Sequence, residues 1–371
     1  MTASNIPSLY LHVPFCAAVC YYCDFARQVY QADACEQWLD AVEQELRETA
    51  VNPGLETVYI GGGTPSCLPL SQLERLLSML DPYTGKVKEF TVECNPELHD
   101  TGIIECLAAH HVNRISIGLQ SADKALLKTA GRRHDADDVK RLVDQFSACG
   151  ISNISLDLMY GLPDQTMAQL EESIAFALSC SPAHLSLYSL TVEPNSVFGK
   201  KGIQQADPDL EADMYERICR ILADAGYIHY EISNFAKPGF ESVHNRNTWK
   251  YRSFYGIGYG AWGMDEHCRY THADTLRAYC SDPLYRRITP LSEKERMFEA
   301  VMLGLRLREG IVPEEFSRMF GCELAACFPK TVSALQERGM LEVREDRIFC
   351  TDRGWPVLNS LLVEFMEEAQ L

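Results

Sequence analysis

The stretch HVPFCAAVCYYCDF, residues 12–25, contains three cysteines in the spacing C-x3-C-x2-C. Cys16, Cys20 and Cys23 follow a short apolar run, so one tight loop after a strand can present the three thiols together. Three thiolates can ligate three irons of a [4Fe-4S] cubane, and the fourth iron then has no protein ligand. The alternatives are three buried structural cysteines, or a zinc site that lacks one ligand.

An iron without a protein ligand is what S-adenosylmethionine (SAM) requires. The amino and carboxylate groups of SAM can chelate that iron and bring the sulfonium beside the cluster for one-electron cleavage. The cysteine spacing therefore predicts a radical SAM protein, whose remaining SAM-binding residues should lie further along the chain.

The composition limits the class of protein. The 371 residues are 46% apolar, carry a formal net charge of −18, and suit one large domain with a small one. An acidic chain argues against a nucleic-acid partner. Fifteen cysteines are scattered along a chain without a signal-peptide pattern, which favours the reducing cytoplasm over a disulfide framework. No apolar stretch approaches the roughly 20 residues of a membrane span.

Short apolar or β-branched runs alternate with helical patterns in the first half of the chain. The predicted strands are residues 8–13, 57–62, 89–94, 114–120, 153–161 and 184–190. Periodicity alone cannot choose between a barrel and an open doubly wound sheet. The cysteines, a glycine cluster and several polar residues follow strand ends, as in βα-barrel active sites. We therefore predict an α/β fold, a partial (β/α)6 barrel, with its first helix running from an N-cap near Asp33 to Thr49.

The second half of the chain is less regular. Residues 234–265 are rich in aromatics and glycines, and they predict a segment that covers a site. Residues 281–290 have the composition of a linker. Helical patterns then lead to LEVRE and RIFCT, which alternate like a two-stranded wing. We expect two domains: residues 1–285, the barrel with its covering segment, and residues 286–371, a small winged-helix-like C-terminal domain.

Gly61, Gly62 and Gly63 directly follow the second predicted strand, in GGGTP. Glycines let a backbone approach a ligand closely and turn its N–H groups toward it. Neither phosphate-binding glycine spacing is present. Taken alone, such a loop is as often structural, but after the cysteines it predicts a site for the polar end of a cofactor.

Several further motifs occur in order along the chain: YLHVPFC (10–16), VECNP (92–96), RISIGLQS (114–121), GRRH (131–134), LDLMYGLPDQ (156–165) and LTVEPN (190–195). Together with the cysteines and GGGTP, they resemble the oxygen-independent coproporphyrinogen III oxidase superfamily of radical SAM proteins over nearly the whole chain. The resemblance implies cluster ligation by Cys16, Cys20 and Cys23, and methionyl binding by Gly62, Gly63 and Thr64. It also implies that Tyr10 and Tyr22 line the cluster and SAM, and that the cofactor site is completed by Glu93, Gln120, Arg132, Asp157 and Thr191.

Within that superfamily the chain is most similar to the haem-chaperone branch, HemW. Phe25 stands where the oxidases have a further cysteine. The branch motif HNxxYW occurs as residues 244–249, with Thr248 in place of the usual tyrosine, and Trp262 replaces a usual histidine. The resemblance implies haem as a third cofactor beside the cluster and SAM, with His244 in its site and with haem binding altered by the two replacements.

The resemblance implies a protein that binds haem and delivers it to haem-requiring acceptor proteins, with peripheral contact where an acceptor is membrane-bound. The alternative is an oxygen-independent coproporphyrinogen III oxidase, in which a radical from SAM takes hydrogen from the substrate's propionates and decarboxylation follows. We do not expect that activity. A third interpretation, nucleic-acid binding through the wing, is disfavoured because LEVREDR mixes acids with bases.

Overall fold

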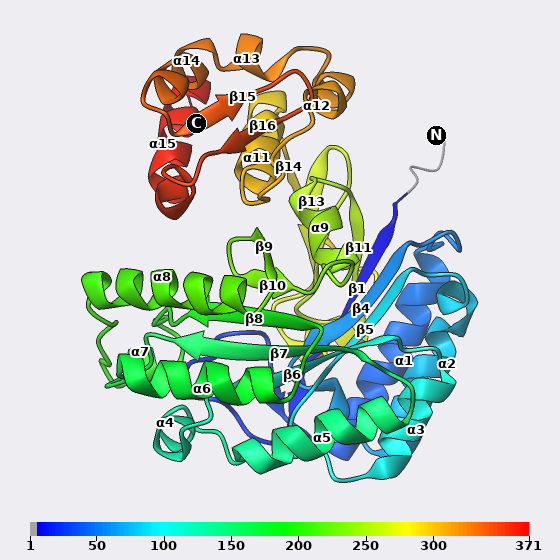
Figure 1. Ribbon diagram of the computed structural model, residues 1–371. Helices are drawn as coiled ribbons and strands as arrows, with labels where there is room; N and C mark the ends of the chain where they lie inside the picture. The colour runs from blue at the N-terminus through cyan, green and yellow to red at the C-terminus, as the bar shows by residue number, and fades with distance from the viewer. Residues whose placement is uncertain (1–5, 371) are drawn as a thin grey trace.

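The computed structural model describes residues 6–370. Its centre is a curved sheet of six parallel strands, each starting at the predicted residue (Figure 1). They are β1 (Ser8–Val13), β4 (Thr57–Gly62), β5 (Glu89–Cys94), β6 (Arg114–Gln120), β7 (Asn153–Tyr160) and β8 (His184–Ser189). The apolar runs form strands because their side chains are buried on both faces, as in parallel sheets covered by helices.

Helices connect these strands and cover the outside of the sheet. They are α1 (Ala32–Glu48), α2 (Leu70–Thr84), α3 (Thr101–Ala109), α4 (Lys124–Thr129), α5 (Ala136–Ala148), α6 (Met167–Ser179), α7 (Val197–Lys200) and α8 (Pro208–Asp224). The N-cap of α1 is Gln31, so the predicted N-cap was wrong. Asp33 instead lies in the first turn, where a negative charge favours the helix dipole.

The six strands do not close into a full barrel. The sheet continues past β1 through β11 (Phe254–Ile257), β12 (Trp262–Met264), β13 (Cys268–Thr271) and β14 (Arg287–Pro290), and past β8 through β10 (Asn234–Ala236) and β9 (Ile228–Glu231). The strand β11 runs parallel to β1, while β12 to β14 form an antiparallel ribbon. The prediction of a partial (β/α)6 barrel is confirmed. Residues 234–265, predicted to cover a site, contribute the strands β10, β11 and β12 to the sheet.

A second hydrophobic core belongs to residues 291–370, which we call the C-terminal module. It contains α11 (Glu293–Gly304), α12 (Pro313–Phe320), α13 (Leu324–Cys327), α14 (Pro329–Glu337), β15 (Leu341–Val343), β16 (Ile348–Cys350) and α15 (Leu358–Ala369). The predicted wing is the hairpin β15–β16. The predicted linker is wrong, because its first residue ends α10 (Leu276–Ser281) and its last four residues form β14. A disulfide joins Cys322 to Cys327, which the cysteine pattern did not predict.

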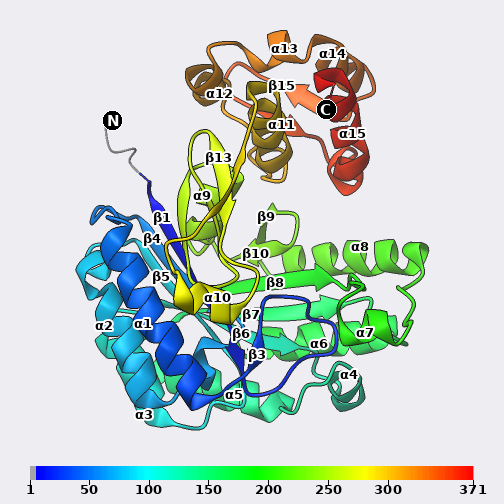
Figure 2. The same cartoon turned by 180° about the vertical axis from the view of Figure 1, so that it is seen from behind.

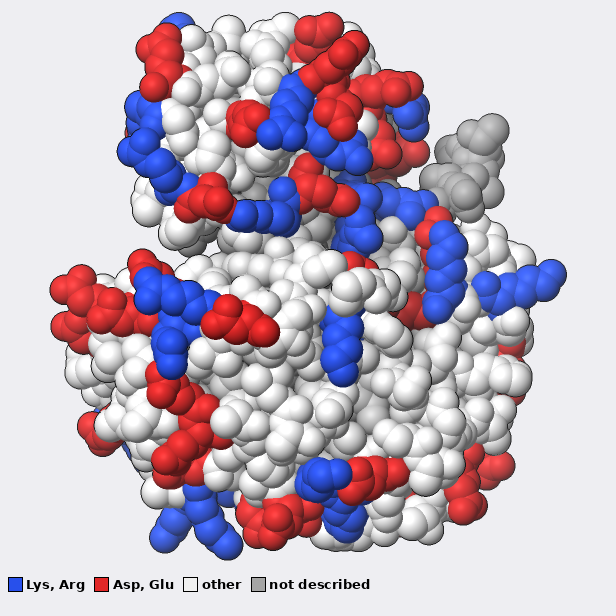
Figure 3. Space-filling view, in the orientation of Figure 1, with Lys and Arg blue, Asp and Glu red and all other residues white. Residues whose placement is uncertain are grey.

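Figures 1 and 2 show the C-terminal module at the end of the sheet where β1 begins. Between the two lies α9 (Val243–Trp249), whose Arg246 donates two hydrogen bonds to Glu309 of the module, at 2.8 and 2.9 Å. On the face shown in Figure 3, basic and acidic side chains are interspersed over both parts. Among residues 6–370 there is no helix both long enough and apolar enough to cross a membrane.

Candidate functional site

Two of the three predicted cluster cysteines, Cys20 and Cys23, lie in one loop of residues 17–27, which we call the cysteine loop. The third, Cys16, directly precedes this loop. The short parallel strands β2 (Phe15–Cys16) and β3 (Gln28–Val29) hold its two ends together. Its middle is fixed by Tyr21, whose N–H donates to the carbonyl of Ala130 at 3.0 Å and whose carbonyl accepts from Phe198 at 2.9 Å. Figure 2 shows this loop passing across the open side of the sheet beside α7.

A cavity of about 420 Å³ lies between the cysteine loop and the parallel sheet, and we call it the inner cavity. Its volume is within the ~300–1,000 Å³ typical of small-molecule sites. All three cysteines line it. So do nine of the eleven predicted cofactor residues: Tyr22, Gly62, Gly63, Thr64, Glu93, Gln120, Arg132, Asp157 and Thr191. The fold thus brings together residues from the ends of separate strands, as the sequence predicted.

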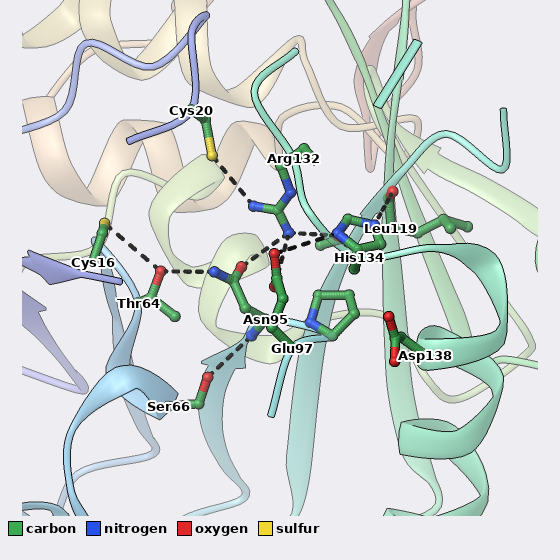
Figure 4. Close-up of polar contacts among 12 residues, drawn as sticks. Cys16, Cys20, Thr64, Ser66, Asn95, Glu97, Leu119, Arg132, His134 and Asp138 are labelled. Atoms are coloured by element: carbon green, nitrogen blue, oxygen red, sulfur yellow. Dashed lines mark hydrogen bonds and ion pairs between the residues drawn. The ribbon is translucent and has the colours of Figure 1, made fainter. Parts of the chain in front are cut away.

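A chain of side-chain hydrogen bonds connects two of the cysteines (Figure 4). Thr64 donates to the Sγ of Cys16 at 3.7 Å and accepts from Asn95 Nδ2 at 3.2 Å. Arg132 donates to Asn95 Oδ1 at 3.0 Å and to the Sγ of Cys20 at 3.3 Å. We did not single out Asn95 from the sequence, although it directly follows the predicted strand 89–94, the position that marks the other site residues.

The donor set fits a cluster held by three thiolates. Burial raises the pKa of Cys16 and raises that of Cys23 to about 11, and iron binding would deprotonate such thiols. Two guanidinium groups lie beside them: Arg132 reaches Cys20, and Arg27 donates to the carbonyl of Cys23. Each has a buried Nε without a hydrogen-bond partner. Guanidinium groups beside these sulfur atoms stabilise anionic thiolates, as in a cluster, more than they stabilise neutral thiols.

Within residues 6–370, no group of three or more His, Cys, Asp or Glu side chains converges on a position for one metal ion. A cubane needs no such convergence, because each thiolate binds a different iron. The chain would supply the three thiolates, and SAM would supply the ligands of the remaining iron.

The glycine loop, residues 61–63, lies against the backbone of β2, just before the cysteine loop. A Cβ at Gly63 would lie 2.4 Å from the carbonyl oxygen of Phe15, so no larger residue fits without movement. The N–H of Gly62 donates to Glu93 at 3.3 Å, and Glu93 also accepts from Tyr59 at 2.7 Å. Burial raises the pKa of Glu93 to about 7. A cationic ammonium group bound in the inner cavity would favour the ionised carboxylate, which could then accept its hydrogen bond.

Two further predicted residues belong to the neighbouring strands β6 and β7. Gln120 ends β6 with a φ of +62°, a left-handed conformation that is uncommon for a residue other than glycine and frequent at functional sites. Asp157 accepts hydrogen bonds from Ser116 at 2.9 and 3.0 Å, and burial raises its pKa. Ser116 and the buried Arg114 also line the cavity, and they share one face of β6. Strand alternation could have indicated these two residues.

The structure places Tyr10 and His244 outside the lining of the inner cavity. Tyr10 donates to His12 or accepts from it, at 2.9 Å. His244 is buried at the opposite end of the strands, with its Nδ1 2.9 Å from the hydroxyl of Thr57 and its N–H bonded to Glu89. Burial lowers the pKa of His244 to about 4. Its neighbour Asn245 reaches the inner cavity instead.

Comparisons with known proteins agree with this arrangement. Residues 10–177 match the Radical SAM superfamily model, and residues 291–357 match the HemN C-terminal domain. Among solved structures, coproporphyrinogen III oxidase (HemN) from Escherichia coli superposes with a TM-score of 0.83 at 23% identity, over 97% of this chain and 90% of that chain. That likeness establishes the fold.

Closer sequence relatives carry the name heme chaperone HemW. The protein from Lactococcus lactis subsp. lactis (strain IL1403) is 38% identical over 368 residues, which are 97% of each chain. The protein from Escherichia coli (strain K12) is 33% identical over 97% of this chain and 98% of its own. Since this similarity runs through the barrel and the C-terminal module alike, the chain belongs to the HemW family of radical SAM proteins.

Proposed function

We propose that the protein is a haem chaperone, which binds haem and delivers it to haem-requiring acceptor proteins. The observation that carries the proposal is the similarity to proteins named heme chaperone HemW over 97% of both chains. The acceptors would include membrane-bound haem enzymes reached by peripheral contact. We expect the protein to act in the cytoplasm, with a functional division between residues 1–285 and 286–371.

In this proposal the inner cavity is the site of the cluster and SAM. Cys16, Cys20 and Cys23 hold the [4Fe-4S] cluster, and Tyr22 packs beside it. Gly62, Gly63 and Thr64 receive the methionyl group. Glu93, Gln120, Arg132, Asp157 and Thr191 complete the site. When bound, the cluster supplies the single electron that cleaves SAM. The chain orients both groups, and its guanidinium groups offset the negative charge of the thiolate-ligated cluster.

The predicted roles of two residues are supported less directly. Tyr10 contacts Tyr59, which lines the inner cavity, with ring centroids 6.0 Å apart. The haem contact expected of His244 stays a prediction, since the side chain is buried against Thr57 and Tyr59.

The experiment is a haem titration of the purified protein after anaerobic cluster reconstitution, followed by mixing with an apo haem protein. The proposal expects stoichiometric haem uptake, seen as a Soret band, and transfer of that band to the acceptor. Absence of haem uptake would overturn it. The second candidate is the coproporphyrinogen III oxidase reaction, which the HemN-like fold could house.

A further inference from the structure

A second cavity, of about 690 Å³, lies on the outer side of the cysteine loop, and we call it the outer cavity. One wall is the cysteine loop at residues 24–26, and the floor includes Tyr10 and His12 of β1. The other wall is the antiparallel ribbon of β12, β13 and β14. Its volume is within the ~300–1,000 Å³ of ligand sites.

Two large aromatic side chains in this cavity are exposed to solvent. Phe25 of the cysteine loop is 63% exposed, the highest value among the large apolar side chains of the described residues, and Trp262 of β12 is 58% exposed. Both line the outer cavity. Leaving such surfaces in water is unfavourable, and aromatic side chains at a cavity commonly mark a ligand or partner.

The ribbon also places a cation on the same face as Trp262. Trp262 is directly opposite Thr271, which is directly opposite Arg287. All three line the cavity, so Arg287 lies two strand spacings, about 10 Å, from Trp262. Arg287 pairs at 2.6 Å with Asp274, which also lines the cavity, so an anionic ligand would share or replace that ion pair. A flat apolar surface with a cation at its edge is complementary to a planar ring that carries carboxylates.

We propose that haem binds in the outer cavity, with its ring against Phe25 and Trp262 and its propionates toward Arg287. The proposal rests on the haem-chaperone function and assigns it a site. The inner cavity is smaller, and the cluster and SAM would fill it. A separate space for a ring larger than SAM is therefore required, and the outer cavity adjoins the cluster.

The histidines in the outer cavity are not available to haem iron. His12 has its Nε2 2.7 Å from the carbonyl of Ala26 and its Nδ1 bonded to Tyr10. His272 has its Nε2 2.6 Å from the buried Glu45 and its Nδ1 3.2 Å from the carbonyl of Ala261. Both imidazoles of the cavity lining are thus fully hydrogen-bonded. Haem is held by stacking and propionate contacts, which allows release to an acceptor that supplies a stronger iron ligand.

The two cavities share part of a wall. Asp24 and Phe25, next to the cluster ligand Cys23, line both of them. The outer side of this wall is tightly packed, because a Cβ at Gly260 would lie 2.5 Å from the Cβ of Ala26.

The test is a haem titration of the reconstituted full-length protein, followed by the Soret band. The cluster absorbance, recorded before haem is added, shows whether each variant still folds its cysteine loop. Phe25→Ala and Trp262→Ala should each weaken haem binding about tenfold, since each removes one stacking surface. Phe240→Ala, at an exposed aromatic outside the cavity lining, should bind as the parent does. Trp262→His should give haem iron an imidazole ligand and shift the Soret band, whereas Phe240→His should not.

The outcomes separate the site from the function. Haem uptake by the parent, weakened by both alanine variants and shifted by Trp262→His, supports the outer site. If the parent takes up haem while all three variants behave identically to it, the outer site is wrong and the chaperone function stands. If the parent takes up no haem, both are wrong.

Discussion

Arg132 donates a hydrogen bond to the Sγ of Cys20 at 3.3 Å, although 112 positions separate the two residues in the sequence. The guanidinium also binds the carbonyl of Gly118 at 3.0 Å and lies 4.0 Å from Glu97. Burial alone would raise the pKa of Glu97, but His134 and Arg132 lower it to about 2. The carboxylate therefore stays ionised and holds Arg132 in place as a positioning residue for the cluster.

Replacing Arg132 by lysine should weaken the cluster site, because an ammonium group cannot reach Cys20, Asn95 and Gly118 at once. By analogy with other residues that support metal ligands, we expect about a 10–100-fold loss of cluster affinity. The measurement is iron retained against a chelator. The exposed neighbour Arg133→Lys is the matched control, and equal iron retention in both variants would contradict the assigned role.

Serine at Cys16, Cys20 or Cys23 should abolish the iron–sulfur absorbance, which is expected near roughly 400 nm. Cys94→Ser is the control, because Cys94 is buried and lines the same cavity but lies outside the cysteine loop. We expect it to assemble a full cluster. Normal absorbance and iron content in the triple serine variant would show that the cluster lies elsewhere.

Alanine at Gly63 should prevent SAM binding, since its Cβ would overlap the Phe15 carbonyl. Forcing the loop apart should lower the free energy of unfolding by about 1–3 kcal/mol. The control is Gly85→Ala, where an added Cβ meets no atom within 4 Å. Equilibrium dialysis with SAM and denaturant unfolding measure the two effects. Parent-like SAM affinity in Gly63→Ala would argue against the glycine loop as the methionyl site.

The pH dependence of stability should contain a contribution from Glu231, at the start of the contact with the C-terminal module. Burial raises its pKa from 4.5 to about 7, against the opposing effects of the Ser233 backbone and the Asn234 side chain. Arg306 opposes this rise, and the other titratable groups near it are Tyr188, Tyr215 and Tyr230. The folded state therefore holds the proton more tightly than the unfolded state does.

It follows that stability should fall as the pH rises from about 4.5 to 7, by on the order of 3 kcal/mol in total. Glu231→Gln cannot ionise, so its unfolding free energy should vary less with pH and should exceed that of the parent at pH 8. The exposed Glu266→Gln serves as the control. Parallel pH profiles for Glu231→Gln and the parent would refute this assignment.

The sequence predicted the parts of the fold that depend on local patterns. The six barrel strands are continuous apolar runs, and the residues that follow them meet at one end because parallel strands share their direction. The strands β10 to β12 have only three or four residues each, too few for a periodic signal. The strand β11 also depends on pairing with the distant β1, which no local pattern encodes.

The same distinction applies to the candidate site. The motifs indicated twelve of the residues that line the inner cavity, the three cysteines and nine cofactor residues. The roles of Asn95 and Arg114 depend on which side chains meet across neighbouring strands. The position of His244 could not be read from its motif, because the direction in which α9 enters the barrel is set by the buried Glu89. That carboxylate accepts hydrogen bonds from the N–H groups of Val243 and His244, at 2.8 and 3.0 Å.

We expect this radical SAM protein to carry haem and not to decarboxylate a porphyrinogen. The most direct measurement incubates the anaerobically reconstituted protein with SAM, a reductant and coproporphyrinogen III, and quantifies porphyrin products while a parallel sample is titrated with haem. We predict haem retained at about one per chain in the parallel sample and no protoporphyrinogen above the level of a Cys16→Ser control. Formation of protoporphyrinogen over many turnovers per chain would contradict the account.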